Sequence, residues 1–244
     1  MRSRSGLRIP LARYGLGTLA AGTVLAAAGA AVSLVVLPWL AAFFGLAWVG
    51  LLLFFRDPER RAAASPEALL SPADGVVRDV GRVAPPAFLK GGAVRVGIFM
   101  SLLDVHVNRS PAAGEVRWVS HHPGSFHDAR TRAALTHNEH NLLGLELPDG
   151  RRILVNQIAG CVARRIVCDV SSGDVLQRGQ RFGMVKFGSR VELYLPAADQ
   201  YEVIVGPGDR VRAGVSVLAT RTCPQEASGP TCRPGAAAEH AKQS

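Results

Sequence analysis

MVKFGSRVELYLP, residues 184–196, is the most regular stretch of this 244-residue chain and the best starting point for predicting its fold. Apolar side chains occupy every second position except 189, namely Val185, Phe187, Val191, Leu193 and Leu195. This alternation predicts a half-buried β-strand, with Lys186, Arg190 and Glu192 on the polar face. Ser189 lies on the apolar face directly after Gly188, and a glycine inside a strand usually marks a bulge or a close backbone approach. By itself, the Gly-Ser pair is explained by a packing kink.

The rest of the body has the texture of a β-rich domain. Short apolar runs at 94–100, 153–155, 166–170 and 201–205 are separated by Gly, Pro and Asp-Gly. Helical periodicity is weak, apart from a short predicted helix near 128–135. The pattern G-D-x-x-x-x-G begins at Gly173 and again at Gly208, 35 residues later (208 − 173). This pattern is similar to that of the hairpins in lipoyl-like barrels. We therefore predict a mainly β (α+β) fold, a compact β-barrel or sandwich with lipoyl-like hairpins and swapped-looking halves.

The N-terminal part differs sharply from this body. Positions 15–55 hold no charged residue, a run of 41 (55 − 15 + 1). One membrane span takes about 20 residues, and Pro38 would interrupt a continuous helix. A transmembrane helical hairpin of roughly 16–36 and 39–55 is expected, although one long re-entrant or interfacial segment is the alternative. Arginines flank both ends, which favours a cytoplasmic side for both ends and for the β-rich body.

These textures divide the chain into three parts. Residues 1–57 form the expected membrane anchor, 58–221 the folded domain, and 222–244 a tail too poor in apolar residues to order itself. The net charge of +9 suits an anionic partner. With only 6% aromatic residues and no basic helix carrying stacking side chains, a membrane surface is a better match than nucleic acid. The four cysteines fit no zinc or redox spacing and are read as reduced thiols.

Eight motifs occur in order along the chain. They are FFRDPER (54–60), SPADGVV (71–77), IFMSLLDVHVNRSPAAGEV (98–116), PGSFHDA (123–129), HNEHN (137–141), QIAGCVARRIVC (157–168), GQRFGMVKFGSRVELYLP (179–196) and GDRVRAG (208–214). In this order the sequence resembles the phosphatidylserine decarboxylase family, in its short bacterial branch, from about residue 55 to 220.

The resemblance implies that the Gly188–Ser189 bond cleaves itself. Ser189 attacks the Gly188 carbonyl, and elimination and hydrolysis leave a pyruvoyl group at the start of residues 189–244, which remain with residues 1–188 as a heterodimer. This covalent cofactor would form a Schiff base with the serine amine of phosphatidylserine and release CO₂ and phosphatidylethanolamine, without metal or pyridoxal phosphate. Two alternatives stay open: another serine-headgroup lipid as substrate, and a membrane-anchored lipoyl-like adaptor without catalysis.

Further site residues are expected from the same motifs. Asp74 lies in an Asp-Gly turn, where it is ordinary turn chemistry, but the resemblance makes it the residue that orients a catalytic histidine. His106 is the candidate base and proton donor near the pyruvoyl group. Arg109 stands where longer relatives have a second histidine, so the base for self-cleavage is open; by charge, Arg109 could hold the substrate's phosphate or carboxylate. His137 and His140 are expected in a substrate-side loop, and no metal site is expected because ligand spacing is absent.

Overall fold

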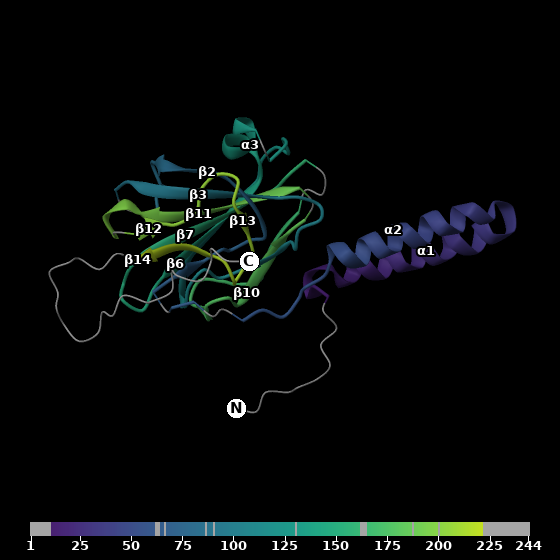
Figure 1. Cartoon of the computed structure of the whole chain (residues 1–244), viewed down its shortest axis with the longest axis horizontal. Helices are drawn as coiled ribbons and strands as arrows, with labels where there is room; N and C mark the ends of the chain where they lie inside the picture. The colour runs from purple at the N-terminus through teal and green to yellow at the C-terminus, as the bar shows by residue number, and fades with distance from the viewer. Residues whose placement is uncertain are drawn as a thin grey trace, which may run out of the picture.

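The computed structural model describes residues 11–221 apart from 62–63, 66, 86, 90, 130, 162–164, 187 and 200. A helical hairpin projects from one side of a β body, as Figure 1 shows. The expected tail at 222–244 lies outside the described residues. The architecture is mainly β, preceded by two apolar helices, which confirms the predicted fold class.

An antiparallel sheet of eight strands forms most of the body, in the order β13-β2-β3-β11-β7-β6-β5-β9. Its strands are β2 (Gly75–Val83), β3 (Ala93–Met100), β5 (Gly114–His122), β6 (His140–Glu146), β7 (Arg152–Ile158), β9 (Val175–Leu176), β11 (Ser189–Pro196) and β13 (Arg210–Val211). One face carries the main apolar core, to which β3, β7 and β11 contribute side chains such as Val96, Val155 and Val191. The alternating pattern thus places β11 at the centre of the sheet, between β3 and β7.

Two three-stranded sheets and short helical segments complete the body. The sheets have the orders β4-β10-β8 and β1-β14-β12. Their strands are β4 (Val107–Arg109), β8 (Ile166–Cys168), β10 (Arg181–Val185), β1 (Leu69–Leu70), β12 (Tyr201–Val203) and β14 (Val217–Arg221). The helical segments are η1 (Arg13–Gly15), α3 (Arg132–His137) and η2 (Ala197–Asp199). Phe182 and Leu218 from the small sheets close the same core.

The expected single strand at 184–196 is wrong in one respect. It is two strands in different sheets: β10 ends at Val185, and β11 begins at Ser189. Gly188 joins them with φ of +60°, a left-handed conformation that glycine adopts without the steric penalty of a Cβ. The polar face of β11 is also buried rather than solvated, because Arg190 and Glu192 pair with each other.

The two G-D-x-x-x-x-G segments adopt one conformation. All four of their glycines have positive φ, at positions 173, 179, 208 and 214. The first segment includes β9, which pairs with β5, and the second includes β13, which pairs with β2. This agrees with the predicted repeated hairpins.

A second repeat shows that the halves of the body are exchanged. The sequences SPADG (71–75) and SPAAG (110–114) form equivalent turns, and each serine hydroxyl donates to the carbonyl two residues later. Their flanks bond reciprocally, Leu70 N to Pro111 O at 2.9 Å and Arg109 N to Pro72 O at 3.0 Å. The serine carbonyl of each turn also accepts a hydrogen bond from the last glycine of one G-D-x-x-x-x-G segment. Gly214 N donates to Ser71 O and Gly179 N to Ser110 O, both at 2.8 Å. The body is therefore built from two interlocked copies of one supersecondary unit.

The hairpin consists of α1 (Leu16–Val36) and α2 (Pro38–Phe54), within one residue of the expected helices. Three glycines spaced by seven, Gly15, Gly22 and Gly29, face the partner segment. A Cβ on them would lie 2.0 Å from the Phe55 ring, 2.4 Å from Leu51 and 2.5 Å from the Phe44 ring. Small residues at such positions let two helices approach closely.

The helices differ in their capacity to cross a bilayer. Arg13–Leu34 is long and apolar enough by length and composition, whereas the apolar helix Trp39–Phe54 is shorter. From 21 residues, α1 is about 31 Å long, close to the hydrocarbon thickness of a membrane. The most distal tryptophan, Trp39, is 67% exposed.

The foot of the hairpin, by which we mean residues 11–19 and 51–56, is fused to the β body. Leu19, Phe54 and Phe55 pack with Val107 and Met184 in one buried cluster. Ala12 N donates to Phe55 O at 2.7 Å, and Leu11 and Arg56 form an isolated antiparallel β-bridge. The hairpin therefore shares a buried core with the strands β4 and β10.

Candidate active site

Ser189 begins β11 and is fully buried. Its register partner on β3 is Met100, whose sulfur accepts the Ser189 hydroxyl at 3.4 Å. Gly188 precedes it in the left-handed conformation, with open space where a Cβ would stand. The Gly188–Ser189 peptide thus lies where an irregular segment enters a rigid central strand.

His106 lies just before β4 and is also fully buried. Its Nδ1 is 2.9 Å from the carbonyl oxygen of Asp104, so Nδ1 carries the proton and donates it. In the part of the chain that the structure describes, Nε2 is buried and has no hydrogen-bond partner. The Phe54 ring lies 4.3 Å from the imidazole, centroid to centroid. Burial is the main cause that lowers the pKa of His106 to about 4, so at neutral pH Nε2 is an unprotonated acceptor.

His106 borders the segment that leads to Ser189. Val185 N donates to His106 O at 3.3 Å, and Met184 is in register with Val107 on β4. No direct hydrogen bond joins the Ser189 hydroxyl to His106 in the described part of the chain, because the hydroxyl points to Met100 and Nε2 has no partner. The structure therefore brings the two to the same end of the sheet without pairing them.

Asp74 occupies a different position from the expected one. Arg60 binds both carboxylate oxygens, with Nη2 to Oδ2 at 2.7 Å, and Ala213 N donates to Oδ1 at 2.8 Å. Because Nδ1 of His106 is engaged by Asp104, Asp74 does not hold the imidazole directly. It acts on His106 only through space, as one of the charges that raise its pKa.

The repeated turn shows that Asp74 is not needed for folding the turn. In the second copy the equivalent residue is Ala113, and the turn keeps its serine-to-carbonyl hydrogen bond, 2.7 Å there and 2.6 Å in the first copy. Because the equivalent turn forms with alanine at this position, turn formation alone does not explain Asp74. A role that is specific to this half of the body explains it better.

Arg109 is buried, and both of its terminal nitrogens donate within the protein, whereas its Nε has no hydrogen-bond partner among the described residues. It donates to Asp57 Oδ1 at 2.9 Å, to Pro58 O at 2.9 Å and to Gly179 O at 3.2 Å. Asp57 also pairs with Arg181 at 2.5 Å. Burial, chiefly, lowers the pKa of Arg109, yet three acceptors satisfy its charge. This geometry argues for a structural brace between the anchor and the repeats, and against the suggested grip on a substrate anion.

The two histidines of the HNEHN motif lie in different settings. His137 is exposed at the end of α3, with Nδ1 2.6 Å from the Thr136 hydroxyl. His140 begins β6, stacks on His122 at 4.7 Å and is in register with Ile158, which is in turn in register with Arg190. His140 therefore lies at the Ser189 end of the sheet, two strands away. Among the described residues, no group of three or more His, Cys, Asp or Glu side chains could hold a metal ion.

A buried polar chain behind this end escaped the sequence analysis. Gln157 donates to Asn108 Oδ1 at 2.8 Å and accepts from Asn141 Nδ2 at 3.1 Å. Asn108 Nδ2 is buried without a partner. The sequence did contain an indication of it, because Asn141 and Gln157 are amides at the next inward-facing positions of β6 and β7, where apolar residues would otherwise be expected. Buried amides at such positions need hydrogen-bond partners.

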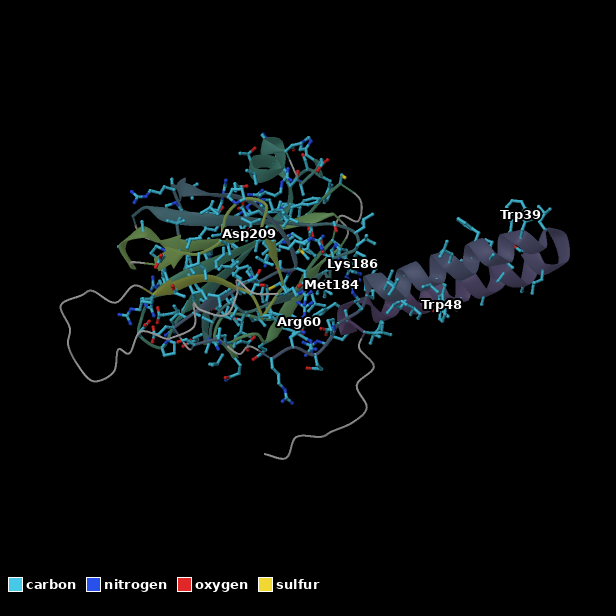
Figure 2. All side chains as sticks on the ribbon, in the orientation of Figure 1. Trp39, Trp48, Arg60, Met184, Lys186 and Asp209 are labelled. Carbon is cyan, nitrogen blue, oxygen red and sulfur yellow. The ribbon has the colours of Figure 1, made fainter. Side chains whose placement is uncertain are left out.

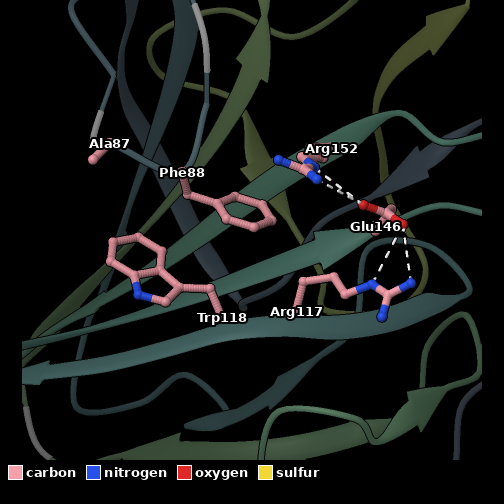
Figure 3. A pocket seen from close by; sticks show the side chains of 6 residues that line it. All are labelled: Ala87, Phe88, Arg117, Trp118, Glu146 and Arg152. Atoms are coloured by element: carbon pink, nitrogen blue, oxygen red, sulfur yellow. Dashed lines mark hydrogen bonds and ion pairs between the residues drawn. The ribbon is translucent and has the colours of Figure 1, made fainter.

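A recess lies elsewhere, on the outer face of the sheet (Figure 3). The rings of Phe88 and Trp118 stack there at 5.8 Å, and Arg117 and Arg152 both pair with Glu146. No predicted site residue lines it. Its charges are paired with one another, so we place the chemistry at the Ser189 end instead.

Comparison with known proteins shows the family of the chain. Residues 51–219, 169 of 244 (219 − 51 + 1), match the family model described as phosphatidylserine decarboxylase. A phosphatidylserine decarboxylase proenzyme of Gluconacetobacter diazotrophicus is 48% identical over 184 residues, 74% of this chain and 81% of the relative. Those of Carboxydothermus hydrogenoformans and Mycobacterium bovis are each 42% identical, covering 87% and 86% of this chain and 98% and 89% of the relatives. The chain belongs to the phosphatidylserine decarboxylase family.

Proposed function

We propose that this protein is a membrane-anchored, pyruvoyl-dependent decarboxylase that converts phosphatidylserine to phosphatidylethanolamine and CO₂. Its relatives carry the name proenzyme, which supports maturation by cleavage. The observation that carries the proposal is the buried Ser189, entered through a left-handed Gly188, at the same end of the sheet as a neutral histidine with an unpartnered Nε2.

Self-cleavage would begin at the Ser189 hydroxyl. Oγ attacks the Gly188 carbonyl carbon, the C–N bond breaks, and the acyl group moves to oxygen as an ester. A serine hydroxyl is a weak nucleophile and needs a base to take its proton. His106 Nε2 is the candidate because it is unprotonated at neutral pH and has no competing partner. The Ser189 hydroxyl must leave the Met100 sulfur for this, which a rotation about its Cα–Cβ bond allows.

The later steps consume one water and release ammonia. Loss of the α-proton of Ser189 expels the Gly188 carboxylate from Cβ and leaves a dehydroalanine, whose hydrolysis yields the pyruvoyl group and ammonia. When present, that group supplies an electron sink for decarboxylation, the role that pyridoxal phosphate plays in other enzymes. The residues around position 189 fit a pyruvoyl group, since this position is buried. The unpartnered Nε2 of His106 could accept a proton there and, once protonated, donate it.

The hairpin would hold this site at a membrane. We place the β body on the cytoplasmic side, because Arg13 and Arg56 stand at the two ends of the hairpin that meet the body. A substrate confined to the bilayer could then reach the Ser189 end without leaving the interface.

Ser189→Ala tests the proposal directly. Wild-type protein should separate on a denaturing gel into chains of 188 and 56 residues (244 − 188), and should release CO₂ from phosphatidylserine in detergent micelles. The variant should remain one chain and be inactive, because it lacks the hydroxyl that attacks and then becomes the ketone.

Ser120→Ala, at a serine on β5 away from β11, is the matched control and should cleave normally. A wild-type chain that stays whole would instead favour a non-catalytic adaptor. Activity of uncut Ser189→Ala would rule out the pyruvoyl mechanism.

A further inference from the structure

Lys186 is a buried cation without an acidic partner. It is only 8% exposed, and its Nζ donates to the Thr18 hydroxyl at 3.3 Å and lies 5.5 Å from the centre of the Phe55 ring. Among the described residues, no carboxylate lies within ion-pairing distance of it. The two buried arginines among the described residues differ, because Arg109 pairs with Asp57, and Arg190 pairs with Asp79 and Glu192. The half-buried Arg60 likewise pairs with Asp74.

An uncompensated buried ammonium is unfavourable for the protein on its own. A hydroxyl and an aromatic face replace only part of the water that the charge loses. Burial first, and then the neighbouring Arg165, lower the pKa of Lys186, in agreement with this lack of an anion. A charge left unpaired in this way is suited to an anion that arrives from outside.

The position of Lys186 indicates which anion. It lies three residues before Ser189, in the connection between β10 and β11. Figure 2 shows it where the hairpin meets the β body, at the opposite end of the hairpin from Trp39. Its partner Thr18 belongs to the first turn of α1. If the hairpin spans the bilayer, this is the level at which lipid headgroups lie.

We infer that Lys186 binds the phosphodiester of the lipid whose headgroup reaches residue 189, an inference that rests on the proposed function. A lysine is a common point-charge partner for phosphate. The headgroup carboxylate is the less suitable anion, since pairing it with a cation would stabilise the ground state that must lose CO₂. Other cations at the foot are already engaged, Arg13 by Asp169 and Arg56 by the carbonyl oxygens of Leu53 and Leu103.

Lys186→Met, Lys186→Arg and Arg13→Met test this inference in the full-length protein. Lys186→Met keeps the buried stem and removes the charge, so KM for phosphatidylserine in non-ionic mixed micelles should rise about tenfold or more, the worth of one charge-assisted hydrogen bond. Lys186→Arg should restore most of the affinity. Arg13→Met removes an exposed charge at the same end, 66% exposed, and should change KM by less than about threefold.

Inorganic phosphate separates the two sources of the anion. If it inhibits the wild type competitively and Lys186→Met poorly, the site accepts phosphate from either source; if it inhibits neither, only the lipid headgroup is held. Both results, with the raised KM, support the inference. An unchanged KM in Lys186→Met, an equal rise in Arg13→Met, or failure of Lys186→Met to cleave would each overturn it. An inactive wild type would instead contradict the proposed function.

Discussion

At the scale of single residues, the fold keeps the imidazole of His106, the proposed base, neutral at pH 7. His106 has Phe54 against its ring, and the charges that reach it are those of Asp104, Arg56 and Asp74. Desolvation outweighs the carboxylates, so the pKa falls rather than rises. The residue that contributes the aromatic ring belongs to the helical hairpin, and the hairpin therefore helps to set the protonation state of the candidate base.

This burial predicts a pH dependence of stability. The pKa of His106 is about 4 in the folded protein against an ordinary value of 6.5, so between these values only the unfolded chain binds the proton. Stability is then complete above about pH 6.5 and falls by about 3 kcal/mol as pH drops to about 4. Urea unfolding of Ser189→Ala at pH 7 and pH 4.5 should show this loss, and adding His106→Gln should remove most of it.

His137→Gln in the same background is the matched control, because His137 is exposed. Its pH dependence should equal that of the parent. If His106→Gln also leaves the acid-induced loss unchanged, the imidazole is not the group that resists protonation.

Sequence motifs predicted which residues to examine, but not how they are paired. Ser189 and His106 lie at one end of the sheet, and their roles stay predictions. The partners of Arg109 and Asp74 could not be predicted, because Asp57 is 52 residues from Arg109 and Ala213 is 139 residues from Asp74. Local patterns carry no information about such distant contacts.

At the scale of elements, the hairpin depends on its glycines. Gly22→Leu places a side chain where a Cβ alone would lie 2.4 Å from Leu51, so the helices must separate. Overpacking of this kind costs about 1–3 kcal/mol. We expect a lower thermal unfolding temperature in detergent than for Gly50→Leu, a matched change on α2 at a position with no atom within 4 Å. Equal stability of the two variants would mean that the helices do not pack along this face.

The strands show both the reach and the limit of periodicity. Alternation predicted the inward face of β11 correctly, and short apolar runs predicted β3 and β7, because one side of each strand packs on the core. It missed the break between β10 and β11, since alternation continues in register across residues 186–188 although the backbone turns at Gly188. It also missed the burial of Arg190, whose partner Asp79 lies 111 residues away.

At the scale of the whole molecule, the proposed cut falls beside the central strand and should not separate the products. Residues 189–244 would contribute β11, which is in register with β3 over eight residues and with β7 over five. Both neighbours belong to residues 1–188. The two chains should therefore co-elute in size-exclusion chromatography in mild detergent and part only in denaturant. Loss of the 56-residue chain under native conditions would contradict this.

A newly made chain end is ordinarily the part of a protein that frays first. Here the terminus would be created in place, already hydrogen-bonded along both edges by β3 and β7. The interior strand would restrict the motion of the reactive carbonyl. The catalytic group would then be held in position from the moment it forms, with no separate cofactor to bind.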